Sequence, residues 1–302
     1  MGISSLLTVI MPVRNGGRYL SEAIESILGQ TLADFEFLIT DDGSTDGTPE
    51  VLSRYAERDR RIRLVPRRGE GYLVALNEML SEARGTFVAR MDADDVSMPD
   101  RLERQAAYLE ANPGCLVVGS RVLVVDPDGD PICFWNEEQR HEEIDTIHLD
   151  GGRGAVICHP AAMMRKADVL AVGGYRERFH TAEDIDLFLR LAERGAVANL
   201  PQALLKYRLH SASVSHIQKP RQVEAIQAAI VEAKIRRGLP PGPVLGTHPE
   251  MVTVWRAHPN WAWWALSAGN VGTARKHAVA SLVEEPFSVA SWRLLYCAVR
   301  GR

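Results

Sequence analysis

The sequence has few cysteines, only four in 302 residues, and none of them stands in a CxxC pair. Cys115, Cys133, Cys158 and Cys297 are scattered along a chain that is long enough to build a core without cross-links. We therefore expect reduced thiols, which excludes a disulfide-rich secreted scaffold and favours a cytoplasmic protein.

The sequence also lacks long apolar runs. No segment approaches the roughly 18 apolar residues that a membrane-spanning helix needs. The first residues, MGISSLLTVIMPVRN, have no basic stretch ahead of an apolar run that stops at Pro12 and Arg14, so they predict a strand and not a signal peptide. We expect a cytoplasmic protein that is either free or peripheral at the inner face of the membrane.

A large excess of charge of one sign is missing as well. Lys plus Arg number 35 and Asp plus Glu number 39, which gives a net charge of −4. Broad nucleic-acid binding is therefore excluded, because it needs clustered cations that displace the counterions of the phosphates. With 46% hydrophobic and 25% charged residues, the composition is that of a globular protein with one large or two smaller domains.

What the sequence does contain is an alternation of short apolar runs with segments of helical period. It predicts strands at residues 8–11, 36–40, 62–65 and 86–91, separated by helices at 19–28, 48–57 and 73–80. Strand-helix-strand units of this length give a mostly parallel, right-handed sheet. The predicted fold class is therefore α/β, with a Rossmann-like sheet flanked by helices.

The second half of the chain has a less regular pattern. It predicts a helix after Pro99, a hairpin of strands 116–125 and 132–135 around a PDGD turn, a strand at 155–165, and a helix at 183–195 that ends on a glycine cap. Further on, the pattern predicts only helices, at 222–236 and, after the breaker-rich linker 238–243, in a region with five of the six tryptophans. We therefore predict an α/β domain at 1–215 and a helical extension at 216–302.

The first acidic cluster contains Asp41 and Asp42, directly after the second predicted strand. Ligands of open parallel sheets bind at the carboxyl ends of the strands, so these carboxylates are placed to accept hydrogen bonds from a nucleotide base or ribose. A capped turn between a strand and a helix explains the same residues.

The second acidic cluster is RMDADD, from Arg90 to Asp95, at the end of the fourth predicted strand. Three carboxylates within four residues repel one another unless a cation neutralises them. Oxygen ligands without a nearby Cys or His pair favour a hard divalent ion, Mg²⁺ or Mn²⁺. A solvated acidic turn before a helix is the alternative.

Two more polar segments are candidates for chemistry. Glu183 and Asp184 open a predicted helix, whose dipole keeps an acid ionised and able to act as a base, although helix capping explains such a pair as well. Arg208 and His210 lie among hydroxyl side chains, a set that suits a diphosphate but also a polar surface strand.

Four segments in this order resemble the family 2 glycosyltransferases, which are nucleotide-sugar enzymes of the type A glycosyltransferase fold. The resemblance covers residues 6–215 and rests on VIMPVRNGGRYLSEAIESILGQT, FLITDDGSTDGT, ARMDADDVSMPDRLERQ and GGYRERFHTAEDIDLFLRL. It implies that Asp184 is the catalytic base and that Asp92 and Asp94, in the family's DxD motif, hold the metal. It implies donor binding by Pro12, Val13, Arg14, Asp41, Asp42, Arg67, Asp92, Ala93, Arg208 and His210, with His159 and Glu183 on the acceptor side.

The function that the resemblance implies is inverting transfer of a sugar from a nucleoside-diphosphate donor, expected to be a UDP-sugar, to an acceptor hydroxyl. Mn²⁺ or Mg²⁺ is the implied cofactor. The implied acceptor is a glycan or a lipid-linked saccharide, in the synthesis of cell-surface polysaccharide, lipopolysaccharide or another glycan.

Two uses remain open for the helical extension, which are packing on the α/β domain and peripheral contact with a membrane. Both uses are suggested by the tryptophans that cluster in this segment and by the basic residues that follow them. The tryptophans are Trp255, Trp261, Trp263 and Trp264, and the basic residues are Arg275, Lys276, Arg293, Arg300 and Arg302.

Three other functions remain open. A sugar nucleotidyltransferase would need a glycine-rich triphosphate loop near the N-terminus, whereas the Gly69-Glu70-Gly71 stretch comes too late. A non-catalytic nucleotide-sugar-binding or scaffold protein of the same fold would fail to hydrolyse a donor. An interaction protein built on the C-terminal helices would need about three repeats, and the single tetratricopeptide-like hairpin before Pro286 is too short.

Overall fold

The structure is a computed structural model that describes residues 7–67, 69–151, 155–210, 219–240 and 257–301. The described residues form one nine-stranded sheet in the order β3-β2-β1-β4-β8-β6-β9-β5, with β7 paired to β6. Its strands are β1 (Leu7–Val13), β2 (Glu36–Asp41), β3 (Ile62–Pro66), β4 (Phe87–Arg90), β5 (Val96–Ser97), β6 (Cys115–Val125), β7 (Pro131–Trp135), β8 (Met163–Arg165) and β9 (Ala196–Arg208).

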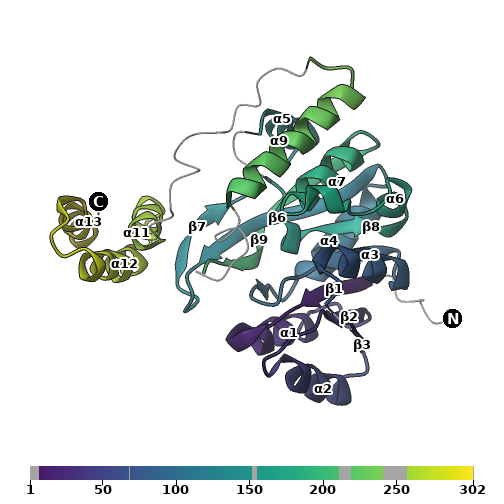
Figure 1. Ribbon diagram of the computed structural model, residues 1–302, viewed down its shortest axis with the longest axis horizontal. Helices are drawn as coiled ribbons and strands as arrows, with labels where there is room; N and C mark the ends of the chain where they lie inside the picture. Colours follow the sequence, from purple (N-terminus) through teal and green to yellow (C-terminus); the bar gives the residue numbers. More distant parts are fainter. Residues whose placement is uncertain (1–6, 68, 152–154, 211–218, 241–256, 302) are drawn as a thin grey trace.

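The sheet is parallel in its N-terminal half. β1 pairs with β2 and β4, and β2 pairs with β3, all in parallel. β6 and β9 are also parallel, whereas β8 runs antiparallel between β4 and β6, and β7 runs antiparallel to β6. The predicted α/β class with a Rossmann-like sheet and C-terminal helices is confirmed (Figure 1).

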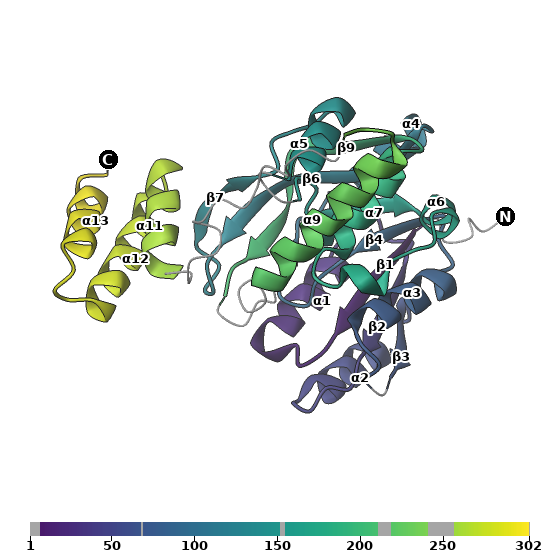
Figure 2. The same ribbon diagram turned by 45° about the horizontal axis from the view of Figure 1, so that its top comes forward.

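Helices cover both faces of the sheet and bury β1 completely (Figure 2). Val9 and Met11 point to one core and Ile10 points to the other, as expected for a parallel strand with two covered faces. The first core is completed by α1 (Leu20–Leu28), α2 (Thr48–Arg58) and α4 (Arg101–Ala111). The second is completed by α3 (Tyr72–Glu82), α5 (His141–Asp150), α6 (Lys166–Ala171) and α7 (Glu183–Ala192).

Two predictions for the second half of the chain are wrong in their bounds. Residues 155–165 do not form one strand, because Pro160 sits in a 3-10 turn, η2 (His159–Ala161), and only β8 after it is extended. The helix α7 ends at Ala192 and not on a cap at Gly195. Gly195 instead allows a close approach to Leu116, whose Cγ would lie 2.6 Å from an added Cβ.

The helices after residue 215 fall into two groups. α9 (Lys219–Arg236) packs on α7, with Ile230 and Ala233 against Leu189. α11 (Ala257–Ser267), α12 (Val271–Glu284) and α13 (Val289–Arg300) form the C-terminal bundle, which packs on the hairpin β6–β7 at one end of the molecule (Figure 1). The predicted boundary near residue 215 lies outside the described residues.

Two tryptophans of the C-terminal bundle pack on this hairpin. Trp261 is buried in a core that includes residues of β6 and β7. Trp264 meets Trp135 edge-on, with 6.1 Å between the ring centroids. Trp263 is 39% exposed and Trp255 lies outside the described residues, so packing accounts for part of the aromatic cluster. Within the described ranges, every helix is too short or too polar to cross a bilayer.

An ion cluster also joins the bundle to the turn between β6 and β7. The ammonium nitrogen of Lys276 lies 2.6 Å, 2.8 Å and 2.7 Å from carboxylate oxygens of Asp126, Asp128 and Asp130. His277 Nε2 lies 3.0 Å from the same oxygen of Asp126. Burial raises the pKa of Asp126, but the hydrogen bonds from His277 and Lys276 outweigh it and hold the pKa below its usual range.

We expect Lys276→Met to lower the free energy of unfolding by about 1.5 kcal/mol at pH 7, because it removes hydrogen bonds between charged groups. The pKa of Asp126 is depressed in the folded state, so this stabilisation is present above the pKa of an unfolded aspartate, about 4, and is lost as the pH falls. Urea unfolding at pH 7 and pH 3.5 should therefore show a smaller difference at the lower pH. Lys276→Arg is the charge-preserving control, and equal stability of the methionine variant at pH 7 would contradict the prediction.

Candidate active site

The carboxyl ends of β1 and β2 lie side by side and carry the first set of predicted residues. Val13 pairs in register with Asp41, and the backbone N–H of Asp42 donates to the Val13 carbonyl at 2.8 Å. Pro12 and Val13 are buried, whereas Arg14 is exposed. One oxygen of Asp41 accepts a backbone N–H from the following turn, at 3.0 Å, so this carboxylate shapes the turn.

The segment after β3 covers Asp42. The N–H of Gly71 donates to Oδ2 of Asp42 at 3.2 Å, and Nε of Arg67 lies 4.0 Å from its Oδ1. The buried side chain of Arg67 also pairs with Glu70 and Glu78. The structure thus brings Arg67 to the same edge as Asp42, with its guanidinium held by acids close to it in sequence.

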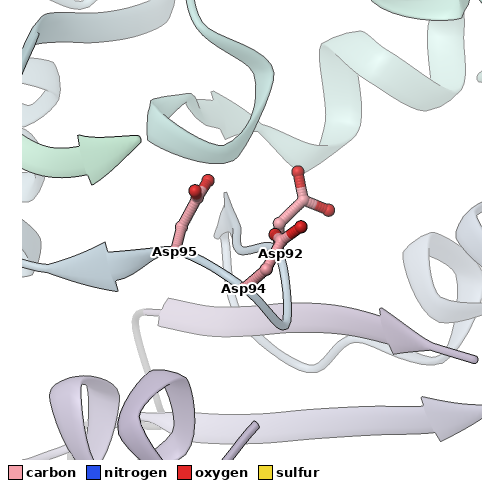
Figure 3. Close-up of side chains that lie close together, drawn as sticks. All are labelled: Asp92, Asp94 and Asp95. Atoms are coloured by element: carbon pink, nitrogen blue, oxygen red, sulfur yellow. The ribbon is translucent and has the colours of Figure 1, made fainter. Parts of the chain in front are cut away.

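Three carboxylates converge in the loop after β4, which we call the acidic loop (residues 92–95). Asp92, Asp94 and Asp95 each offer an oxygen within 4.8 Å of the others, and their side chains leave the loop on the same side (Figure 3). Ala93 is half-buried between them. Asp95 was not predicted to be a metal ligand, although it belongs to the same acidic run.

The acidic loop fits a divalent cation. Oδ2 of Asp95 is buried and has no hydrogen-bond partner among the described residues. Burial raises the pKa of Asp92, and burial together with the charges of Asp94 and Asp92 raises the pKa of Asp95 well above its usual range. A cation would relieve both costs, and an all-oxygen donor set suits Mg²⁺ or Mn²⁺.

A buried arginine lies beneath the acidic loop. Arg90, the last residue of β4, is fully buried, and its guanidinium donates to Oδ1 of Asp92 and, at 2.6 Å, to the hydroxyl of Tyr72. Arg101 of α4 is also fully buried and donates to the Arg90 carbonyl at 2.7 Å. Neither arginine was predicted as a site residue, although both belong to the motif ARMDADDVSMPDRLERQ.

Glu183 and Asp184 occupy the first turn of α7, where the helix dipole favours negative charge. Burial raises the pKa of Asp184 to about 6, and burial together with the Asp184 charge raises the pKa of Glu183 to about 8. The charge of Asp92 contributes to the raised pKa of Asp184 and that of Arg90 opposes it. The helix start and the acidic loop therefore belong to one electrostatic site.

The backbone just before this acid pair is strained. Thr181 has a φ of +79°, a left-handed conformation that is unfavourable for a β-branched residue. Its hydroxyl is buried without a hydrogen-bond partner in the described ranges. Such strain persists only where the surroundings hold the chain, and it is common at functional sites.

His159 lies in η2 and is buried. Its Nε2 is 2.7 Å from the hydroxyl of Tyr175, and its ring packs edge-on against Phe188 of α7. Burial, with help from the charge of Arg90, lowers the pKa of His159 well below its usual range, so the imidazole is neutral at physiological pH. Tyr175 was not predicted as a site residue, although it belongs to the motif GGYRERFHTAEDIDLFLRL.

The end of β9 returns to the acidic loop. The backbone N–H of Arg208 donates to Oδ1 of Asp95 at 2.9 Å, and its Nε donates to the carbonyl of Asp94 at 2.9 Å. Nε2 of His210 lies 2.8 Å from Oδ2 of Asp94. The structure thus brings the predicted pair Arg208 and His210 to the acidic loop.

The guanidinium of Arg208 contacts two further elements. It pairs with Glu22 at 2.6 Å and lies over the ring of Tyr19, 4.5 Å from its centroid. It also donates, at 3.3 Å, to the carbonyl of Pro127, in the turn that binds Lys276. Neither Glu22 nor Tyr19 was predicted, because both fit an ordinary amphipathic helix start.

A Rossmann-like sheet, an acidic loop at the end of a central strand and a second acid pair in the same electrostatic site together define a glycosyltransferase of the type A fold. The chain belongs to glycosyl transferase family 2, whose family model matches residues 8–172.

Relatives with known names support this assignment. EpsE of Bacillus subtilis (strain 168) is 39% identical over 209 residues, which cover 67% of this chain and 72% of EpsE. The O-antigen biosynthesis glycosyltransferase WbnJ of Escherichia coli is 32% identical over 215 residues, which cover 70% of this chain and 82% of WbnJ.

Solved structures share the fold at low sequence identity. The mannosyltransferase PcManGT of Pyrobaculum calidifontis, in complex with GDP-Man and Mn²⁺, has a TM-score of 0.60 at 21% identity, over 98% of this chain and 79% of PcManGT. Residues 1–349 of TarS from S. aureus, in complex with UDP-GlcNAc, have a TM-score of 0.63 at 16% identity, over 98% of this chain and 92% of TarS.

Proposed function

We propose that this glycosyltransferase moves a sugar from a nucleoside-diphosphate donor, a UDP-sugar, to an acceptor hydroxyl with inversion at the anomeric carbon. The observation that carries the proposal is the acidic loop at the end of β4, where three carboxylates converge beside Arg208 and His210. Screening UDP-, GDP- and dTDP-sugars for metal-dependent hydrolysis tests it, and the absence of turnover with every donor would contradict it.

Asp92 and Asp94 are the proposed ligands of Mn²⁺ or Mg²⁺. Oδ2 of Asp95, which has no hydrogen-bond partner in the described ranges, fits the same role. A bound divalent ion supplies Lewis-acid neutralisation of the charge that develops on the leaving diphosphate. Arg208 and His210 lie against this loop, so we assign them to the diphosphate as well. The Mn²⁺ in the PcManGT structure supports the choice of metal.

The nucleoside is proposed to bind along the edge where β1 and β2 end. Asp41 and Asp42 offer carboxylate oxygens there, and Pro12 and Val13 form the floor. Arg14, Arg67 and Ala93 complete the proposed donor side. The UDP-GlcNAc in the TarS structure supports a uridine nucleotide, whereas the GDP-Man in PcManGT keeps guanosine donors in the screen.

Asp184 is the proposed base that takes the proton of the acceptor hydroxyl. Its raised pKa, about 6, makes the Asp184 carboxylate a stronger base than an ordinary aspartate. The carboxylate is still ionised near neutral pH, which suits it to accept a proton. Glu183 and the neutral His159 are proposed to face the acceptor. With the acceptor attacking opposite the leaving group, no enzyme nucleophile is required, which parallels the two-carboxylate logic of inverting glycosidases.

The name of WbnJ supports a role in the synthesis of cell-surface polysaccharide or lipopolysaccharide, with a glycan or a lipid-linked saccharide as acceptor. A non-catalytic scaffold and a sugar nucleotidyltransferase are the alternatives that the donor assay must distinguish from this function. Donor hydrolysis without triphosphate consumption separates the proposed function from both.

We expect Asp94→Asn to reduce turnover at least a hundredfold without unfolding the protein, because it removes a ligand from a surface loop. Wild-type activity should disappear in excess chelator and return with added Mn²⁺. Initial rates of donor hydrolysis and a thermal melt measure both effects. Asp150→Asn, an exposed substitution at the end of α5, is the control, and full activity in chelator would contradict a metal-dependent reaction.

We expect Asp184→Asn to lower kcat by about a hundredfold or more and to leave the KM for donor nearly unchanged, as for a lost general base. In the wild type, kcat should fall as the pH is lowered through about 6, because protonation removes the base. Measurement of kcat between pH 4.5 and 8.5 tests for this decrease. A loss confined to the donor KM, or a rate that stays constant down to pH 5, would leave Asp184 with helix capping alone.

We also propose that the protein works in the cytoplasm, at the inner face of the membrane, with the C-terminal bundle as its contact. The turn before α13 exposes Phe287 by 96%, and α13 exposes Trp292 by 56% and Tyr296 by 59%. Arg293 and Arg300 lie among them, and α13 contains no acidic residue. Exposed aromatic rings with arginines suit the headgroup region of an anionic bilayer.

Vesicles of phosphatidylcholine with phosphatidylglycerol should therefore co-sediment with the protein at low salt. Replacing both Phe287 and Trp292 with Ser should reduce the bound fraction at least fivefold, because it removes the apolar rings that would enter the interface. Ile235→Ser, at a position on α9 that is 63% exposed, is the matched control. The absence of wild-type binding would leave the bundle with its packing role only.

A further inference from the structure

Two hollows lie beside β7, and none of their lining residues has been given a role in the proposed reaction. The first has a volume of about 370 Å³ and lies between β7, the residues that follow it and Val156. The second, of about 420 Å³, lies between β7, Arg121 of β6 and Trp264 of α11. Both volumes fall in the range of small-ligand sites, roughly 300 to 1,000 Å³.

The two hollows share the side chains of Phe134, Trp135 and Glu137. Phe134 is 42% exposed, and the guanidinium of Arg121 lies over its ring, 4.1 Å from the centroid. Arg121 also donates to Glu137 at 2.6 Å. The shared wall therefore presents an aromatic surface beside a charged donor and acceptor pair, a combination that suits the apolar faces and the hydroxyls of a sugar ring.

The walls of the first hollow are held in place by hydrogen bonds. The amide nitrogen of Asn199 on β9 donates to the carbonyls of Glu138 and Val156, at 2.8 Å and 2.7 Å. The amide nitrogen of Asn136, in the same wall, is buried and has no hydrogen-bond partner among the described residues. A buried unpaired donor is costly unless a ligand or a water molecule pairs with it.

The first hollow lies near His159, one of the residues proposed to face the acceptor. Val156, in the wall of the first hollow, is three residues before His159, a span of at most about 11 Å. The ring of Trp135 packs on Tyr207, which directly precedes Arg208. The proposed nucleoside edge at β1 and β2 is on the far side of β4, β8 and β6 in the sheet.

We propose that these two hollows form a subsite for the acceptor, a saccharide of several units whose terminal hydroxyl reaches Asp184. The inference rests on the proposed function and adds the class of acceptor, an oligosaccharide and not a single sugar. Because Trp264 lines the second hollow, the C-terminal bundle contributes directly to this subsite.

An array of neutral oligosaccharides of two to six units, with the matching monosaccharides, tests the subsite on the full chain in the absence of donor. Saturation-transfer NMR then ranks the bound sugars. We expect at least one oligosaccharide to bind at least tenfold more tightly than its monosaccharide, and Phe134→Ala and Glu137→Gln each to remove most of this gain. Leu170→Ala, at a position on α6 that is 45% exposed, should leave it unchanged.

The failure of this inference and the failure of the proposed function have different signatures. Binding that does not increase with saccharide length, or that Phe134→Ala leaves intact, overturns the subsite even if donor hydrolysis is normal. Length-dependent binding that requires Phe134 supports the subsite even if no donor is hydrolysed. A thermal melt of each variant with its donor-hydrolysis rate identifies any variant that fails to fold, and Glu137→Gln then decides the outcome.

Discussion

The charge of one buried guanidinium is the constraint on which the rest of the site depends. Arg90 ends a central parallel strand and is the buried cation that donates to Asp92 of the acidic loop. Burial pushes Asp92, Glu183 and Asp184 toward their neutral forms, and the charge of Arg90 opposes that shift in each of them. The positive charge of Arg90 therefore favours the ionised forms of these acids, which burial and their mutual repulsion disfavour.

Hydrogen bonds to backbone carbonyls fix the position of that charge. Arg101 holds the Arg90 carbonyl, and Gln105 on the same helix donates to the carbonyls of Val118 and Ala161, at 3.0 Å and 2.7 Å. The side chains of α4 thus connect β4, β6 and η2, the turn that contains the buried His159. A buried polar network with paired donors gives rigidity, which a site that must place a base and a leaving group in line requires.

The sequence predicts well the features that local patterns encode. The first four strands and the helices between them follow from apolar period and turn residues, and the acidic loop and the first turn of α7 follow from motifs at their ends. The contact between Arg90 and Tyr72 could not be predicted, because Tyr72 comes from another segment, whose pattern is that of an ordinary core helix. The long strand β9 was missed for a different reason, since Pro201 and Gln202 interrupt its apolar alternation.

The turn between β6 and β7 has a consequence for how such chains can diverge. Its aspartates bind Lys276, while the carbonyl of Pro127 accepts from Arg208 and from Arg18. The same five-residue turn thus serves as a dock for the C-terminal bundle and as a support for an arginine at the acidic loop. C-terminal helices could therefore not be exchanged between relatives as independent modules. A new helical segment would need a cation that binds this turn. Otherwise the turn and Arg208 would have to change together.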